Sequence, residues 1–299
     1  MDVSVIFVNY NTLNLLVNAI DSVFSKTEGI KYEIIVIDNN STDDSKNILF
    51  ERYGNKINCV FLSENIGFGR ANNEAIKIAK GRNIFLLNPD TILINNAIKI
   101  LSDYLDNDPS VGVCGGNLYD ENFSPMHSYT HVLPSIFAEI NFLFLNLPLQ
   151  LLYGKSVEFN TTNKPMEVAY ITGADMMLKS DVLRNVGFFD EDFFMYYEET
   201  ELTYRIKQGG YKVISVPNAK IIHLESKSFS YHSIKQKMML YGRYLYYKKL
   251  HSKIYYLFAN VIFLLNCLIR IVIYWILNDK TKKLYWSSYF QNLIKQKIL

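Results

Sequence analysis

Short, continuous apolar runs alternate with helical patterns along the first part of the chain. The runs lie at residues 3–8, 32–38, 58–62, 83–88 and 111–116, and helical periodicity follows at about residues 12–24, 44–53, 70–80 and 95–105. Strands that are apolar at every position are typical of a parallel sheet with helices on both faces. The pattern therefore predicts an α/β fold with a mostly parallel sheet flanked by helices.

The alternation breaks down between about residues 119 and 165. An apolar run at 137–154 is interrupted there by Pro148 and Gly154. We expect a long irregular insert, which in a compact domain is usually functional or mobile. Beyond it, the sequence predicts an acidic helix at 198–210 and two short strands separated by Pro217.

Polar residues follow each of the first four predicted strands, at 9–11, 38–41, 63–67 and 88–90. Each group alone is ordinary turn chemistry. The carboxyl ends of parallel strands meet at one edge of a sheet, where ligands bind in open α/β folds. Together the four groups therefore predict a polar crevice at that edge.

Several common sites are excluded. The chain has no GxxxxGK[ST] motif, and GFGRAN at 67–72 lacks a third glycine and follows the third strand, so neither a P-loop nor a dinucleotide fingerprint is present. Three cysteines without paired spacing argue against a disulfide framework and a zinc site, and suit a reducing compartment. The amino terminus has no basic leader and is not expected to be a signal peptide.

Charge divides the chain into two parts. Residues 226–299 carry thirteen Lys or Arg and one acidic residue, Asp279, out of totals of 31 and 29, so this tail is +12 and residues 1–225 are −10. A basic tail with long apolar and aromatic runs favours an anionic membrane surface as partner. Nucleic acid is disfavoured because the cations are interleaved with apolar runs.

The apolar stretch at 254–277 is long enough to span a bilayer. It also contains Asn260, Asn266 and Arg270, and an arginine near mid-span costs about 2.5–3.5 kcal/mol on insertion scales. We place an interfacial helix or hairpin first, a true span second and a buried core helix third.

Six stretches occur in the order seen in family 2 glycosyltransferases of the GT-A fold. They are VSVIFVNYN, VIDNNSTDDS, ENIGFGRANN, LLNPDT, ITGADMMLKSDVLRNVGFFDEDFFMYYEETEL and IIHLESKS. The set most resembles the bacterial rhamnosyltransferase-like subgroup and covers about residues 3–228. The resemblance implies a GT-A domain over residues 1–225, with an acceptor-side insert at about 119–165. The charge and the apolar runs described above predict a helical, membrane-associating tail at 226–299.

The resemblance also implies an activity. It is an inverting transfer of a sugar from a nucleotide-diphosphate donor to a hydroxyl of a cell-surface polysaccharide or lipid-linked glycan, at the cytoplasmic face of the membrane. dTDP-rhamnose is the favoured donor, and a UDP-hexose is possible. The alternatives are a catalytically inactive nucleotide-sugar-binding or assembly scaffold and, far lower, a nucleotidyltransferase, which would need a Gly-rich basic loop where this chain has NYNTLN.

A divalent cation, Mg²⁺ or Mn²⁺, is expected because an acidic domain would otherwise repel a diphosphate. Asp90 matches the last aspartate of the family's DxD-type motif, with Asn88 at its first position. His223 matches the histidine that often completes the metal site; the alternative is a half-buried strand histidine. Glu225 stands where the family usually has glycine.

The other site residues are also carried over from the family. Glu199 matches the catalytic base, which takes the acceptor proton, although acids also gather at helix N-termini to complement the dipole. Glu201 is expected to pair with Arg205 instead. Donor binding is expected from Val8, Tyr10, Asp38, Asn65, Gly67, Arg70 and Asn73. The sugar and acceptor side is expected from Gly173, Ala174, Asp175 and Glu198.

Overall fold

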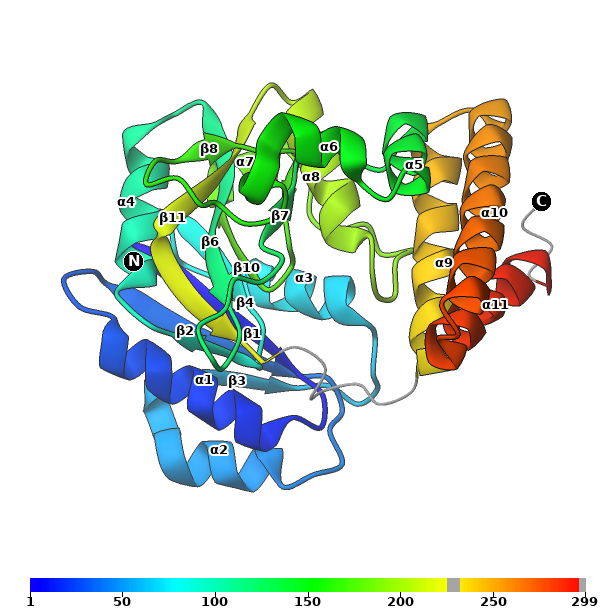
Figure 1. Cartoon of the computed structure of the whole chain (residues 1–299). Helices are drawn as coiled ribbons and strands as arrows, with labels where there is room; N and C mark the ends of the chain where they lie inside the picture. The colour runs from blue at the N-terminus through cyan, green and yellow to red at the C-terminus, as the bar shows by residue number, and fades with distance from the viewer. Residues whose placement is uncertain (225–231, 296–299) are drawn as a thin grey trace. The chain divides into compact units, whose positions relative to one another are not determined.

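The computed structural model describes residues 1–224 and 232–295, so Glu225 and the expected boundary after it lie outside the described residues. The chain forms two compact units (Figure 1). The first unit comprises Met1–His131, Lys155–Phe194 and Glu198–Ser230. The second, called here the helical unit, comprises Val132–Gly154, Met195–Tyr197 and Tyr231–Leu299.

A mixed sheet forms the centre of the first unit, with strand order β3-β2-β1-β4-β10-β6-β11-β5 and β8 paired to β11. The strands are β1 Val3–Asn9, β2 Tyr32–Asp38, β3 Asn58–Phe61, β4 Asn83–Leu87, β5 Thr91–Leu93, β6 Val111–Tyr119, β8 Met166–Glu167, β10 Asp175–Lys179 and β11 Lys212–His223, while β7 Tyr129–Thr130 and β9 Tyr170–Ile171 form a separate pair. The first four strands are parallel, as expected, and β10 enters antiparallel between β4 and β6.

Helices cover both faces of this sheet. Alternate residues of β1 point to opposite sides: Val5 and Phe7 pack with α1 Leu13–Lys26, α2 Ser45–Tyr53 and α4 Ala97–Asn107, whereas Ile6 and Val8 pack with α3 Phe68–Ile78, α7 Ser180–Val186 and α8 Glu198–Gln208. Figure 1 shows α1 and α2 on one side of the strands and α3 on the other. Burial on both faces explains why these strands read as continuous apolar runs.

Two expectations about local structure were wrong. The insert is not irregular throughout, because Ser135 caps α5 Ile136–Leu143 by accepting from Ala138 N, and α6 Leu147–Tyr153 follows after a 97° bend. Pro148 lies in the first turn of α6, where a proline is tolerated. The two strands expected around Pro217 are one strand, β11, whose ladder with β6 shifts register between Ser215 and Lys220 and so leaves a place for a residue without an N–H.

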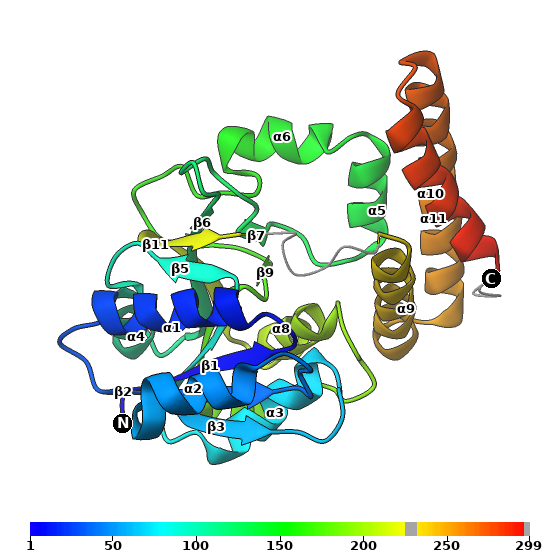
Figure 2. The same ribbon diagram turned by 90° about the horizontal axis from the view of Figure 1, so that it is seen from below.

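The helical unit joins α5 and α6 to α9 His232–Leu250, α10 Lys253–Ile276 and α11 Lys280–Lys295. Figure 2 shows α9, α10 and α11 side by side, and α10 also contacts α5. The Arg243 guanidinium is buried and donates to Glu139 Oε1 at 2.7 and 3.0 Å and to Asn260 Oδ1 at 2.6 Å. This pair, with its extra hydrogen bonds, ties the insert helix α5 to the tail helices α9 and α10.

Within the described residues, α10 is long and apolar enough to cross a membrane, and α5 with α6 would pass the same test as one broken span. Short 3₁₀ turns follow α2 at Gly54–Lys56 and α6 at Gly154–Ser156.

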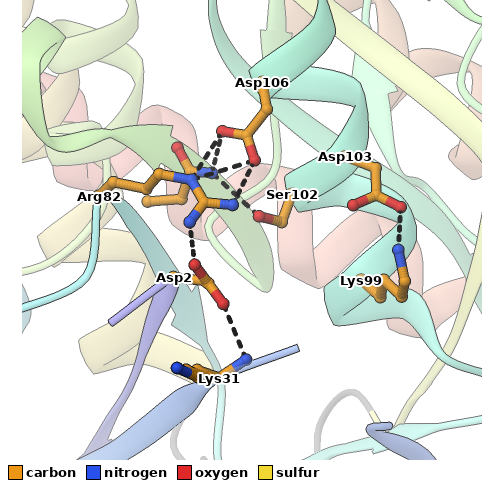
Figure 3. A network of polar contacts seen from close by, with 8 residues as sticks. Asp2, Lys31, Arg82, Lys99, Ser102, Asp103 and Asp106 are labelled. Atoms are coloured by element: carbon orange, nitrogen blue, oxygen red, sulfur yellow. Dashed lines mark hydrogen bonds and ion pairs between the residues drawn. The ribbon is translucent and has the colours of Figure 1, made fainter. Parts of the chain in front are cut away.

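An ion-pair network lies at the edge of the sheet where β1 and β4 begin (Figure 3). Arg82 Nη2 lies 2.7 Å from Asp106 Oδ2, and the same guanidinium contacts Asp2. A backbone bond from Lys31 and the Arg82 side chain lower the pKa of Asp2. Partial burial opposes the change at Asp106, but hydrogen bonds from Arg82 and Asn83 bring its pKa below the ordinary value as well.

We expect Arg82→Ala to lower the free energy of unfolding by about 1 kcal/mol at pH 7, because two carboxylates lose their common partner. Carboxylates with depressed native pKa values stabilise the fold above the unfolded pKa, and this contribution is lost as the pH falls below about 3.9. The difference between wild type and variant should therefore shrink between pH 7 and pH 3 in urea titrations.

Lys99→Ala is the matched control, since Lys99 makes a single exposed pair with Asp103 one turn away on α4. It should cost about 0.3–0.5 kcal/mol. If Arg82→Ala lowers the free energy of unfolding by the same amount at pH 3 and pH 7, the effect comes from packing and not from charge.

Candidate active site

The carboxyl ends of β1 and β2 are joined through Asn9. Its side chain is buried, and Nδ2 lies within hydrogen-bond distance of Asp38 Oδ2 (2.8 Å), Ser45 Oγ (2.9 Å) and Ser41 Oγ (3.1 Å). Thr12 Oγ1 donates to Asn9 Oδ1 at 2.8 Å. Asn9 was among the polar strand ends of the sequence but was not proposed as a site residue, and its part in orienting Asp38 is visible only in the fold.

Asp38 is buried and held by two loops. Its Oδ2 accepts from Asn9, and its Oδ1 accepts from Ser41 N at 2.8 Å. Val8 is buried in the strand before it, whereas the Tyr10 side chain is 46% exposed at the same edge. The structure thus brings these three predicted donor-binding residues to one edge, and of the three only Tyr10 has an exposed side chain.

Asn39 links the second polar group to the third. Its Nδ2 donates to Asn65 Oδ1 at 2.9 Å, and its Oδ1 accepts from Ile66 N at 2.9 Å. Gly67 follows, with a φ of 89°, and a Cβ there would lie 2.4 Å from Phe194 O. Glycine at 67 is therefore required by the backbone, and Asn65 shapes the turn that leads to it.

Arg70 and Asn73 follow on α3. Arg70 is exposed and Nε donates to Glu191 O at 2.7 Å. Asn73 is buried and exchanges two hydrogen bonds with the backbone of Phe189, at 2.9 and 3.0 Å. These contacts give Asn73 a structural part, holding the loop before α8; its donor-binding part stays a prediction.

Asp90 and His223 meet where β5 pairs with β11. Asp90 Oδ1 lies 3.3 Å from His223 Nε2, and both side chains are largely buried. Among the residues that the structure describes, no group of three or more His, Cys, Asp or Glu side chains could hold a metal ion. Two protein ligands nevertheless fit Mg²⁺ or Mn²⁺, since such ions use one or two side chains together with waters and substrate phosphates.

Glu198 and Glu199 occupy the first turn of α8 in different surroundings. Glu198 is buried, and its Oε2 has no hydrogen-bond partner within the described ranges. Burial, and then the neighbouring Glu199 charge, raise the pKa of Glu198 well above its ordinary value. Glu199 is less buried, and burial raises its pKa as well.

Glycine 173 lies against Glu199. A side chain at position 173 would approach Glu199 Cγ to 3.6 Å. Gly173 thus lies beside the Glu199 side chain, and its acceptor-side role stays a prediction. Ala174 is buried, and its carbonyl accepts from Asn88 N at 3.0 Å, which anchors the Asn88–Asp90 turn.

Asp175 begins β10 opposite Leu87, the last residue of β4, and its acceptor-side role stays a prediction. Its side chain is fully buried between β4 and β6, and Oδ2 accepts from Gly116 N at 2.6 Å. Burial raises the pKa of Asp175 well above its ordinary value. By contrast, the expected pairing of Glu201 with Arg205 is confirmed, at 2.7 Å.

A model of the glycosyl transferase family 2 matches residues 4–164, which is more than half of the chain. The chain belongs to this family. A glycosyltransferase of Rickettsia typhi, described as uncharacterized, is 32% identical over 193 residues, or 63% of this chain and about half (54%) of that protein. The N-acetylglucosaminyl-diphospho-decaprenol L-rhamnosyltransferase of Mycobacterium tuberculosis is 24% identical over 211 residues, or 65% of this chain and 67% of that protein.

Solved structures of other glycosyltransferases share the fold. A mannosyltransferase from Pyrobaculum calidifontis in complex with GDP-Man and Mn²⁺ has a TM-score of 0.58 at 17% identity, covering 98% of this chain and 84% of that one. GalNAc-T7 with UDP, GalNAc and Mn²⁺ has a TM-score of 0.58 at 16% identity, covering 83% and 50%. The predicted GT-A fold of this family 2 member is confirmed.

We expect Gly67→Ala to destabilise this glycosyltransferase by about 3 kcal/mol, from a left-handed backbone and an overlap with Phe194 O. Gly54→Ala is the matched control, because Gly54 has a φ of 50° but a Cβ added there would meet no atom within 4 Å. The free energy of unfolding of this control should fall by only about 1 kcal/mol. Equal losses of unfolding free energy in urea would contradict the close contact at Gly67.

Proposed function

We propose that the chain is an inverting, metal-dependent glycosyltransferase that moves a sugar from a nucleotide-diphosphate donor to a hydroxyl of a cell-surface polysaccharide or lipid-linked glycan. The observation that carries the proposal is the difference in exposure between Glu198, which is buried, and Glu199, which is partly exposed. Burial favours the neutral form of a carboxyl group and raises the pKa of both, so we assign the charge and the role of base to the less buried Glu199.

In the proposed reaction, Glu199 takes the proton of the acceptor hydroxyl. The oxygen of that hydroxyl attacks the anomeric carbon of the donor sugar, and the bond between this carbon and the diphosphate breaks. A single displacement of this kind inverts the configuration at that carbon. A raised pKa brings the carboxylate closer to the working pH and makes it a better proton acceptor. Glycine at 173 leaves space for the acceptor beside Glu199.

Donor binding is assigned to the carboxyl edge of β1 to β4. Asp38 and Tyr10 would meet the base or ribose, and Asn65, Gly67 and Arg70 the base or diphosphate. Asp90 and His223 would hold Mg²⁺ or Mn²⁺, which when bound offsets the diphosphate charge in a part of the chain with a net charge of −10. The Mn²⁺ in both structural relatives supports this assignment.

We favour dTDP-rhamnose as donor, with a UDP-hexose as the alternative. The printed activity of the M. tuberculosis relative, L-rhamnose transfer to a decaprenol-linked sugar, supports rhamnose and a lipid-linked acceptor. Because the match spans only about half of the R. typhi relative, donor and acceptor remain part of the proposal.

We further propose that the helical unit binds the cytoplasmic face of an anionic membrane as an interfacial element. In α10, Asn260 and Asn266 are buried, and Arg270 donates to Phe142 O and stacks on the Phe142 and Trp286 rings. The opposite face is apolar and exposed along the whole helix, at Ile254, Phe258, Val261, Leu265, Leu268, Val272 and Trp275. The +12 charge of residues 226–299 complements anionic lipid.

We expect Glu199→Gln to lower kcat for transfer by about 10²–10⁴-fold, because the amide cannot accept the acceptor proton. Donor affinity, measured by calorimetry with Mn²⁺, should stay within about twofold. Glu51→Gln makes the same change at an exposed position of α2, outside the polar strand ends, and should leave kcat unchanged.

The same assay separates the alternatives. Chelation, or Asp90→Asn, should abolish donor binding, and Mn²⁺ should restore it to the chelated wild type. Donor binding that persists without a metal would refute the metal assignment. Donor binding by wild type without transfer to any acceptor would favour the inactive scaffold.

The membrane proposal predicts that the full chain floats with vesicles that contain phosphatidylglycerol. A double variant, Phe258→Glu with Val272→Glu, should bind at least about tenfold more weakly, since two exposed apolar side chains (59% and 52%) would meet lipid as carboxylates. Phe50→Glu, on α2 of the first unit and 77% exposed, is the control and should float like wild type. Equal flotation of both variants would exclude α10 as the contact.

A further inference from the structure

The bent pair of helices α5 and α6 exposes an apolar surface without charge. Residues 132–154 contain one charged residue, Glu139, and its carboxylate is buried against the Arg243 guanidinium at 2.7 Å. In α6, Leu149 is buried, but Leu151 and Leu152 are 86% and 71% exposed. The exposed apolar side chains of the pair and of the bend between its helices include Phe137, Phe144, Leu145, Leu147, Leu151 and Leu152. Exposed apolar side chains gathered in one short segment mark an interaction surface.

The bend itself is apolar where a turn in water is normally polar. Leu145 and Asn146 have left-handed backbones, with φ of 58° and 64°. Glycine or asparagine suits such a position, and a leucine there is uncommon. The side chains of Phe144, Leu145 and Leu147 are exposed. Neither the backbone conformation nor contact with water therefore accounts for the apolar residues at this bend.

The backbone donors of the bend are satisfied without water. The N–H groups of residues 144–147, 149 and 150 donate to oxygen atoms of residues 140–146 at 2.9 to 3.1 Å, and Pro148 has no N–H. Asn141 organises these bonds, since its Oδ1 accepts from Leu149 N at 3.1 Å and its Nδ2 donates to Asn146 Oδ1 at 2.8 Å. A turn in water can leave such groups to the solvent, but a segment in hydrocarbon must satisfy them internally. The donors of the bend meet that condition.

The bend belongs to a unit that also exposes an apolar face on another helix. Within the helical unit, α5 contacts α10, and Ile136 N donates to Tyr255 Oη at 2.9 Å. In the part of the chain that the structure describes, α10 and the α5–α6 pair are the segments whose hydropathy suits a membrane. An uncharged, leucine-rich surface with a satisfied backbone matches hydrocarbon better than it matches a protein interface, which normally includes hydrogen bonds at its rim.

We propose that the α5–α6 bend inserts into the hydrocarbon region of a lipid bilayer from one side, as a monotopic wedge. The leucines of α6 and the side chains of the bend then contact acyl chains in place of water, and removal of their apolar surface from water stabilises the inserted state. The inference deepens the proposed function and rests on it in one respect, that the helical unit meets a bilayer. It does not require the proposed contact through α10.

Quenching by lipid reports insertion of the bend directly. Phe144→Trp places an indole at the bend of the full chain, and wild type supplies the emission of Trp275 and Trp286 as background. The vesicles contain phosphatidylcholine and phosphatidylglycerol, with or without bromine atoms on the acyl chains. The added emission should fall in the brominated vesicles, because bromine quenches an indole at close contact. Phe50→Trp, on α2 and 77% exposed, is the control and should lose none of its added emission.

Flotation measures how much the inserted surface contributes to binding. Leu151→Glu with Leu152→Glu should bind the same vesicles at least about tenfold more weakly, because two carboxylates would have to enter hydrocarbon. Both side chains are exposed, so the thermal midpoint of this double variant should match that of wild type. Phe50→Glu again serves as the control and should float like wild type.

The possible results distinguish insertion of the bend from the contact through α10. If the chain floats but the emission from position 144 is not quenched, the bend stays in water and the inference is overturned, while the α10 contact is unaffected. Quenching that persists in Phe258→Glu with Val272→Glu supports insertion independently of α10. A chain that neither floats nor shows quenching refutes both membrane contacts. If Leu151→Glu with Leu152→Glu floats like wild type but converts a dimer to a monomer in sedimentation without lipid, the surface joins two copies of the chain and the inference is overturned.

Discussion

The buried amide of Asn9 is the point from which the candidate active site is built. The parallel register places Asn9 opposite Asp38, and their side chains form a 2.8 Å hydrogen bond where both strands end. Asn39 then extends the network to Asn65, and so to the left-handed glycine that begins α3. Each buried polar group thus satisfies another. The same residues that fold the loops therefore form the edge where a donor is proposed to bind, which is why turn chemistry and site chemistry could not be separated in the sequence.

The acidic residues around this edge are accommodated in different ways. Burial raises the pKa of Asp175 and Glu198, which favours their neutral forms, and Arg205 neutralises Glu201 with a 2.7 Å ion pair. Asp90 instead faces an imidazole, and Glu199 keeps partial contact with solvent. Asp90 and Glu199 are therefore the two carboxylates to which we assign separate parts in the proposed reaction, cation binding and proton transfer.

Local patterns predicted what depends on neighbours in sequence. Strands β1 to β4 match the expected runs to within a residue, because burial on both faces leaves an unbroken apolar signature. Pairings between distant segments were not predictable in this way. Asp175 followed a Gly-Ala pair and resembled a ligand, but its burial depends on β10 entering between β4 and β6. Asn73 is bound by Phe189, 116 residues away. Glu201 was predicted correctly because its partner lies one helical turn further on.

The helical unit shows why the direction of side chains matters more than average hydrophobicity. In the sequence alone, Asn260, Asn266 and Arg270 counted against a membrane-spanning helix. In the fold, Asn260 accepts from Arg243, which in turn pairs with Glu139 from a helix more than a hundred residues earlier, and Arg270 bonds to Asn266 and to Phe142 O. These polar groups are therefore satisfied inside the unit. The apolar residues between them face outward, and this exposed apolar face supports the proposed interfacial role more directly than the length of the helix does.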